Sequence, residues 1–417
     1  MTKSTVYFCT GALLFALAAC SAQNNNADVS SQTTEQLSQD ENIDNNTDAN
    51  GEAPDGAPPE RPDGENGAPD GKNPPPDSNG DKPDAPGNGK TGGFGGSGKV
   101  TQGDSANTIT EDSTISGESY SSDGDDENAL RIKGANAVLS DISVNKSSGS
   151  SSNTEDGDFY GMNAALLATD KASVTIKNAV IKSSAQNGNG VFSYGEGTSV
   201  NISDSSISTS ADNSGGIMTT GGAAMNASDL TVTTSGNSAA AIRSDRGGGT
   251  VNVDGGSYTT TGANSPAVYS TADISIKNAE LTAKHSEGIV IEGQNSVSLE
   301  NCTVSGSMDS ENSVSAEENT EAVMIYQSMS GDAKAGLSSF SMNSGSLTSE
   351  KGDVFYVTNT DCTISLKNAD IKNNSTGYLL RVCGNSGKRG WGTAGKNGAN
   401  VTMTADSENL NGDIAVD

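Results

Sequence analysis

Tyrosine and arginine side chains recur at one position of a repeating segment, and they are the residues of this sequence best suited to binding chemistry. Each segment contains a small or β-branched residue followed by a large apolar one, as in Ala129-Leu130 and Ala267-Val268. If the large residue points inward, the next residue points outward, because side chains alternate along a strand. The predicted outward column is Arg131, Leu167, Ser193, Thr219, Arg243, Tyr269, Ile291, Ile325, Tyr356 and Arg381.

A column of this composition suits carbohydrate. Tyrosine rings stack on sugar rings, and the planar guanidinium of arginine pairs with uronate carboxylates. Trp391, the only tryptophan, stands beside two cations in residues 388–392 (KRGWG), and we assign it to the same surface. The predicted glycan-binding residues are Arg131, Arg243, Tyr269, Tyr356, Arg381 and Trp391. The alternative is a mixed solvent face, with Trp391 as a lid on the core.

Acidic residues gather in one loop before the first of these segments. Asp123, Asp125, Asp126 and Glu127 offer hard oxygen ligands at a spacing that binds calcium weakly. A solvated loop is the alternative explanation, and the sequence contains no glycine-rich nonapeptide calcium repeat. We therefore predict no cofactor and keep these four carboxylates as weak calcium candidates.

The strands that position these residues come from a repeat in the last three quarters of the chain. SVTIKNAVI at residues 173–181 returns as ISIKNAEL at 274–281 and as ISLKNADI at 364–371. Each copy alternates apolar and polar residues, breaks at Asn or Asp, and resumes with another apolar residue. Stacked turn side chains can hydrogen-bond along the axis. The predicted turn column is Asn178, Asp204, Asp254, Asn278, Asn301, Asn343 and Asn368.

A repeat of roughly 25 residues built from short strands predicts a solenoid of about ten coils. It resembles the right-handed parallel β-helix of pectate lyases, polygalacturonases and many bacterial surface adhesins, and the resemblance covers residues 101–417. We therefore expect an all-β, single-stranded right-handed parallel β-helix. A β-sandwich and a left-handed β-helix, which needs a hexapeptide repeat, are the alternatives.

The resemblance to polygalacturonases implies a hydrolase site made of NTD, DD, GHG and RxK sequences on neighbouring coils. Here DD at 125–126, RIK at 131–133 and NTD at 359–361 stand in a different order, and His285 lacks flanking glycines. Arg131 and Asp361 lie about nine coils apart, roughly 40 Å at one strand spacing per coil. We predict no catalytic residue and no enzyme activity. A diverged lyase or hydrolase acting on acidic polysaccharide is the alternative.

The first residues indicate where the protein is located. Residues 1–19 are similar to a bacterial lipoprotein signal peptide, with Lys3 before a short apolar run and LAAC ending at Cys20. That resemblance implies cleavage before Cys20 and a diacylglyceryl anchor on its sulfur, on the extracellular face of the cell membrane. Residues 20–100 are acidic, rich in Pro, Gly and Asn and poor in apolar side chains, which predicts a disordered stalk. Residues 101–417 form the predicted β-helix domain.

Charge, cysteines and the last residues limit the partners. The net charge of −29 argues against nucleic acid. Cys302, Cys362 and Cys383 fit buried apolar positions, with a Cys362 to Cys383 disulfide as the alternative. Residues 400–417 still have strand patterns, so an open last coil offers its backbone to end-to-end self-association. We expect a lipid-anchored, non-enzymatic surface protein that binds polysaccharide or cell-surface glycan, or alternatively a structural or self-assembling spacer.

Overall fold

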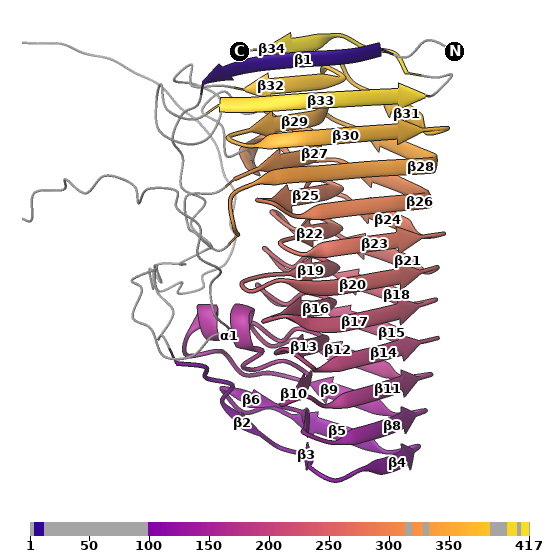
Figure 1. Cartoon of the computed structure of the whole chain (residues 1–417). Helices are drawn as coiled ribbons and strands as arrows, with labels where there is room; N and C mark the ends of the chain where they lie inside the picture. Colours follow the sequence, from indigo (N-terminus) through magenta and orange to yellow (C-terminus); the bar gives the residue numbers. More distant parts are fainter. Residues whose placement is uncertain are drawn as a thin grey trace, which may run out of the picture. The chain divides into compact units, whose positions relative to one another are not determined.

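The computed structural model describes residues 4–11, 99–312, 319–327, 333–383, 398–406 and 410–416. Within them, parallel strands stack into two long sheets, and the expected all-β parallel β-helix is confirmed (Figure 1). The described helices are α1 (Thr154–Tyr160) and the short 3-10 helix η1 (Ser310–Asn312). Cys20 and the predicted stalk before residue 99 lie outside the described residues.

The larger sheet has 20 strands: β1 (Ser4–Gly11) pairs at its edge, and the other 19 are parallel and lie in two files, which the turn column joins within each coil. The first file consists of β4 (Ser113–Ser116), β8 (Asn136–Ser140), β11 (Ser173–Lys177), β14 (Ser199–Ser203), β17 (Ala223–Ser228), β20 (Gly249–Asp254), β23 (Asp273–Lys277), β26 (Ser296–Gly306), β28 (Leu337–Ser349), β30 (Asp361–Lys367) and β33 (Gly398–Asp406). The second consists of β5 (Ser119–Ser122), β9 (Ser143–Lys146), β12 (Val180–Ser183), β15 (Ser206–Thr209), β18 (Thr231–Thr234), β21 (Ser257–Thr260), β24 (Glu280–Ala283), the second halves of β26 and β28, and β31 (Asp370–Asn373).

The smaller sheet has 12 strands and closes the third side of the coil. Its strands are β3 (Thr108–Ile109), β7 (Leu130–Lys133), β10 (Leu166–Thr169), β13 (Val191–Tyr194), β16 (Ile217–Thr220), β19 (Ile242–Ser244), β22 (Val268–Ser270), β25 (Ile289–Glu292), β27 (Glu321–Tyr326), β29 (Asp353–Thr358), β32 (Leu380–Cys383) and β34 (Ile414–Val416). The strand pattern expected in residues 400–417 is confirmed by β33 in the larger sheet and by β34 at the end of this one. A separate pair, β2 (Asp104–Ser105) and β6 (Glu127–Asn128), lies beside the first coils.

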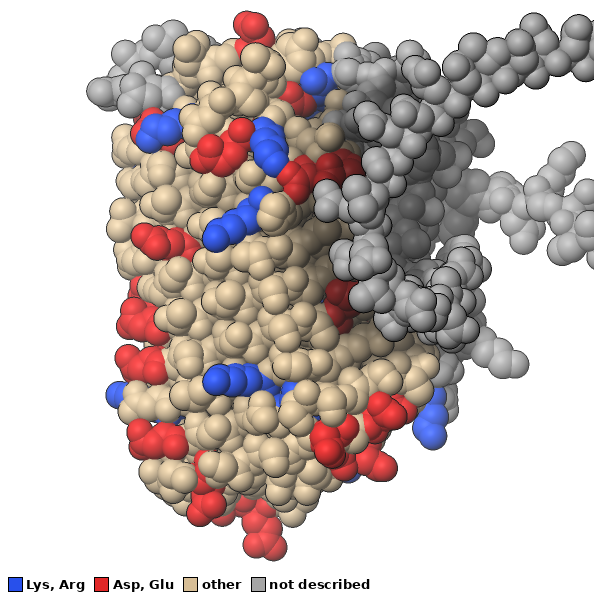
Figure 2. Space-filling view, turned by 180° about the vertical axis from the view of Figure 1, so that it is seen from behind, with Lys and Arg blue, Asp and Glu red and all other residues tan. Residues whose placement is uncertain are grey.

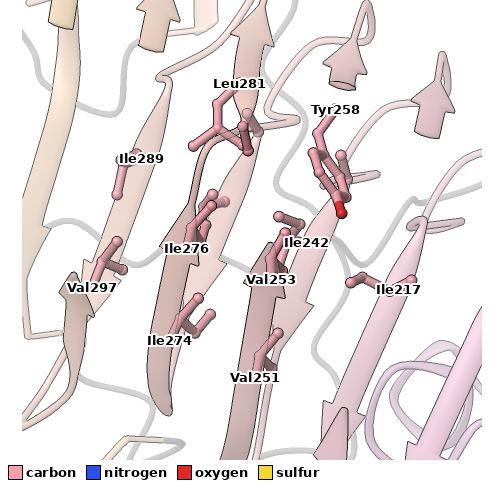
Figure 3. Close-up of a cluster of buried hydrophobic side chains, with 14 of the residues drawn as sticks. Ile217, Ile242, Val251, Val253, Tyr258, Ile274, Ile276, Leu281, Ile289 and Val297 are labelled. Carbon is pink, nitrogen blue, oxygen red and sulfur yellow. The ribbon is translucent and has the colours of Figure 1, made fainter. Parts of the chain in front are cut away.

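The core fills the inside of the coils with one apolar layer from each strand. Val253, Ile276 and Leu299 stack from coil to coil in register, each in the alternating pattern that its strand requires. Figure 3 shows this packing around Ile276 and Tyr258. The alternation seen in the sequence therefore produces a continuous, mainly apolar core along the axis.

The turn column has the left-handed backbone that Asn and Asp tolerate. Asn178, Asp204, Asn278, Asn301 and Asn368 have φ between 50° and 53°. In two coils the prediction is one residue early, because the left-handed position is taken by Gly255 after Asp254 and by Ser344 after Asn343. The predicted ladder is present in part: Asn278 Nδ2 donates to Asp254 Oδ1 at 2.7 Å, and Asn301 Nδ2 donates to Asn278 Oδ1 at 3.0 Å.

The cysteines and the last coil complete the fold. Cys302, Cys362 and Cys383 are buried, and the structure joins none of them in a disulfide, so the alternative of a Cys362 to Cys383 disulfide is wrong and the apolar assignment holds. The predicted open edge at β33 is paired in this structure with β1 (Ser4–Gly11), which runs antiparallel to it. End-to-end self-association stays a prediction.

Candidate functional site

The arginine and tyrosine candidates lie on the outer face of the 12-stranded sheet. Strand register pairs Arg131 with Leu167, Arg243 with Tyr269, and Tyr356 with Arg381. The column in the structure is Arg131, Leu167, Phe192, Met218, Arg243, Tyr269, Val290, Met324, Tyr356 and Arg381. Five of the six glycan candidates therefore share one column, and Trp391 lies outside the described residues.

Four members of the predicted outward column are on the wrong face. Ser193, Thr219, Ile291 and Ile325 point into the core and are fully buried. The physical reason is that a slip of one residue turns every side chain of a strand to the opposite face. In a strand with two adjacent apolar residues, the pattern does not decide which of the two points inward. The register with the neighbouring strand decides it: Val191 points inward because it is paired with Leu166, which points inward.

The column is a second, largely buried layer instead of a solvent face. Tyr356 is 2 % exposed and Arg381 is 7 % exposed. In the first coils, α1 lies against this face (Figure 1), where Leu167, Phe192 and Met218 form a small apolar cluster. Sugar stacking on Tyr356 would therefore require neighbouring segments to move.

Arg243 holds α1 to a distant coil. Its Nη2 contacts Asp158 Oδ2 from α1 at 3.2 Å and Asp245 Oδ2 at 2.7 Å. Burial raises the pKa of Asp158 to about 6, opposed by the neighbouring Arg243 charge and reinforced by Asp245. Asn187 Nδ2 also donates to Asp158 Oδ1 at 2.9 Å. Two carboxylates therefore balance the Arg243 charge, which leaves little attraction for a uronate.

A tyrosine and glutamate network follows on the next coils. Tyr269 Oη donates to Glu292 Oε2 at 2.5 Å, and Tyr326 Oη donates to the same oxygen at 3.0 Å. Burial, followed by the Glu292 charge, raises the pKa of both hydroxyls well above the ordinary tyrosine value. Both tyrosines are therefore proton donors at neutral pH. They hold the carboxylate in place.

Buried charge continues at the last strands of the sheet. Arg381 Nε donates to Asp353 Oδ2, and its guanidinium lies 4.6 Å from the Tyr378 ring centroid. Glu321, in register with Asp353, is 2 % exposed. Burial, together with the Glu287 and Asp353 charges, raises the pKa of Glu321 well above its ordinary value. The sequence pattern did not single out these acidic partners, because they lie next to strand ends and far apart in the chain.

Arg131 acts within the first coils. Its Nη2 donates to the backbone oxygens of Gln102 at 2.6 Å and Asp104 at 2.9 Å, and its Nε donates to Asn128 Oδ1 at 2.9 Å. These bonds fasten residues 102–104 to β7. The RIK sequence of β7 and the NTD sequence before β30 lie near opposite ends of the stack, so the enzyme-like fragments do not meet (Figure 1).

The acidic loop at residues 123–127 is tied into its surroundings. Asp125 Oδ1 accepts the backbone N–H of Ser150 at 2.7 Å, and Asp126 Oδ1 accepts that of Ser152 at 2.6 Å. Beside them, fully buried Lys146 donates to Ser122 Oγ at 3.2 Å. Within the described ranges, no three Asp, Glu, His or Cys side chains are arranged to hold a metal ion. The geometry assigns the Asp125 and Asp126 carboxylates to loop bonds.

A groove that the sequence did not predict lies on the outer face of the larger sheet. It has a volume of about 420 Å³ and crosses β11, β14, β17, β20 and β23. Exposed asparagines occupy its centre, where Asn226 Nδ2 donates to Asn201 Oδ1 and Asn252 Nδ2 donates to Asn226 Oδ1, both at 2.9 Å. Its other polar lining residues are Thr175, Ser203, Ser228, Asp254, Ser275 and Lys277. The signal available in the sequence was Asn at the same mid-strand position of three consecutive copies.

Comparison with models of protein families, with curated proteins and with solved structures gave no match for this chain. Among the described residues, no helix has the length and apolar character needed to cross a membrane.

Proposed function

We propose that this protein is a lipid-anchored, non-enzymatic surface protein whose β-helix binds carbohydrate. The observation that carries the proposal is the groove across β11 to β23, because its asparagine ladder lies open to solvent on a rigid sheet. Amide groups both donate and accept hydrogen bonds, as sugar hydroxyls do. A preformed groove with a few convergent polar groups is the usual form of a ligand site.

The anchor is supported by the sequence. The short apolar run ending at Cys20 has the form of a lipoprotein signal, and the acidic, proline-containing residues 20–100 suit a spacer between membrane and head. A spacer of this kind would separate the head from the membrane. Adhesion to a polysaccharide layer or to a glycan of another cell is the biological role that we infer.

Binding is tested with the full mature chain on an array of neutral, acidic and amino-sugar polysaccharides. We expect binding to at least one carbohydrate class. A Thr233→Ala variant, altered on the second strand file outside the groove lining, serves as the control and should bind equally. Absence of binding to every carbohydrate would refute the proposal.

The anchor is tested by membrane fractionation and by metabolic labelling with a fatty acid. We expect the wild-type protein in the membrane fraction and labelled, and the Cys20→Ala variant unlabelled. Equal labelling of both proteins would refute lipidation at Cys20.

One observation favours the enzyme alternative, a polysaccharide lyase or hydrolase. Two hydroxyls, those of Tyr269 and Tyr326, donate to the Glu292 carboxylate, and the Arg243 guanidinium lies over the Tyr269 ring. Burial raises the pKa of both hydroxyls. Groups with shifted pKa values cluster at reactive sites. Release of reducing or unsaturated sugars from acidic polysaccharide would establish it. Loss of that release in Glu292→Gln would assign the reaction to this place.

A further inference from the structure

We infer that the groove binds a neutral, unbranched polysaccharide chain that lies parallel to the axis of the β-helix. This inference rests on the proposed carbohydrate-binding function and goes further by naming the ligand class and its direction. It is argued from the register of the strands, the free hydrogen-bonding capacity of the asparagines and the pairing of the nearby charges.

The direction follows from register. Asn201, Asn226 and Asn252 are aligned in successive parallel strands, with Thr175 before them and Ser275 after them. The polar groups therefore form a straight line across five strands, about 4.8 Å apart from one strand to the next. A linear polymer along this line meets a similar polar group on each coil. A chain laid across the strands would meet only one or two.

The asparagine ladder leaves capacity for a ligand. Each amide has two N–H donors and an oxygen with two lone pairs. The ladder bonds use one N–H of Asn226 and one of Asn252, and one lone pair on each acceptor oxygen. One donor and one acceptor position therefore remain on Asn226, which is exposed, and its orientation is already fixed by both neighbours. Preorganisation of this kind reduces the entropy lost on binding.

The charges at the groove favour a neutral ligand. Lys277 Nζ lies 3.0 Å from Glu300 Oε2, and the Lys277 pKa is raised by its hydrogen bond and charge interaction with Glu300. The Nζ of Lys177, the last residue of β11, lies 3.7 Å from Asp204 Oδ2. Both cations are thus paired with carboxylates, and the whole chain carries −29. A polyuronate would be repelled by the protein without gaining an unpaired cation.

The lining also predicts how affinity depends on chain length. Its polar groups are amides, hydroxyls, one ion-paired lysine and the Asp254 carboxylate, and it contains no aromatic side chain on which a sugar could stack. Binding therefore depends on summed hydrogen bonds, and affinity should rise with each added sugar until the ligand spans the groove, roughly 20 Å for five strands. Longer chains should gain little more.

The test measures binding of cello-oligosaccharides, chito-oligosaccharides and oligogalacturonates of increasing length to the full mature chain by calorimetry. We expect neutral oligomers to bind, with affinity that rises and then levels off with length. Asn226→Ala should weaken binding about tenfold, because two hydrogen bonds to the ligand are lost. Asn145→Ala, the same change at an exposed strand position on β9, is the matched control and should bind as the wild type does.

The possible results separate the inference from the function on which it rests. Preference for oligogalacturonate would overturn the neutral ligand and keep carbohydrate binding. Neutral binding that Asn226→Ala leaves unchanged, in a variant with wild-type thermal stability, would overturn the groove as the site. If Asn226→Ala is less stable, Asn226→Lys decides, because a gain of oligogalacturonate binding supports the site and no gain overturns it. If none of these oligomers binds, the inference is overturned. If the polysaccharide array also shows no binding, the proposed function is overturned with it.

Discussion

Replacing Tyr258 with phenylalanine should make this protein more stable. Tyr258 lies in β21 with its side chain in the core, in register with Val232 and Leu281 (Figure 3). Its side chain is fully buried, and its hydroxyl has no hydrogen-bond partner in the described part of the chain. Burial also raises the pKa of this hydroxyl above the ordinary tyrosine value, with a smaller contribution from the Asp229 charge.

The magnitude follows from the unmade hydrogen bond. A buried polar group without a partner costs about 1–3 kcal/mol, and phenylalanine removes that group while keeping the ring that fills the core. We therefore expect Tyr258→Phe to raise the free energy of unfolding by about 1–3 kcal/mol. At about 2–4 °C per kcal/mol, the melting temperature should rise by several degrees.

The assay is urea unfolding of the mature chain and of each variant under identical conditions, followed by circular dichroism. Tyr326→Phe is the matched control, because its equally buried hydroxyl lies 3.0 Å from Glu292 Oε2 and 3.1 Å from Tyr269 Oη. It should lower the unfolding midpoint while Tyr258→Phe raises it. A lower or unchanged midpoint for Tyr258→Phe would show that the hydroxyl is satisfied and that the argument is mistaken.

Two further predictions concern the turn column and the buried charge. Asn278 has φ 53°, a left-handed backbone that Gly adopts more easily than Ala. Asn278→Ala should therefore lower the free energy of unfolding, measured in urea, by about 1–2 kcal/mol, and Asn278→Gly should lower it less. Equal stability of the two variants would contradict backbone strain at this position. Burial raises the pKa of Asp158 from 3.8 to about 6, so its contribution to stability is complete below pH 3.8 and is lost as pH rises through 6. Between pH 4 and pH 7, the free energy of unfolding of the wild type should therefore fall by up to about 3 kcal/mol more than that of Asp158→Asn. If the stabilities of the two proteins changed with pH in parallel, Asp158 would not be the group responsible.

The fold was predictable because its information is local and repeated. Most coils contain the apolar alternation of two strands and an Asn or Asp that accepts a left-handed backbone, so one copy such as residues 173–181 predicts the rest. Errors occurred where the local pattern has two solutions. Val191 and Phe192 are both apolar, and only pairing with the neighbouring coil decides that Val191 points inward.

The buried charges of the outer layer could not be predicted in this way. Arg243 meets Asp158 across 85 positions of sequence, through a helix inserted between β9 and β10. Neither residue has a periodic equivalent, so the repeat contains no information about their contact. The groove would have been easier to predict from the sequence, since Asn201, Asn226 and Asn252 recur at one position of the repeat. We predicted hydrogen-bonded ladders only for the turns, although an exposed mid-strand position allows the same bond.

Free hydrogen-bonding capacity is what separates the two candidate faces. On the 12-stranded sheet, Arg243 and Arg381 are paired with buried carboxylates, and breaking one partner of such a pair costs about 3–5 kcal/mol. A ligand that bound either arginine would first have to break its ion pair with the buried carboxylate, and this cost would offset the free energy of binding. On the larger sheet, a ligand needs to displace only water from Asn226 and its neighbours. The face with the more reactive residue types is therefore the one that holds the protein together, and the face with plain amides is the one that is free to bind.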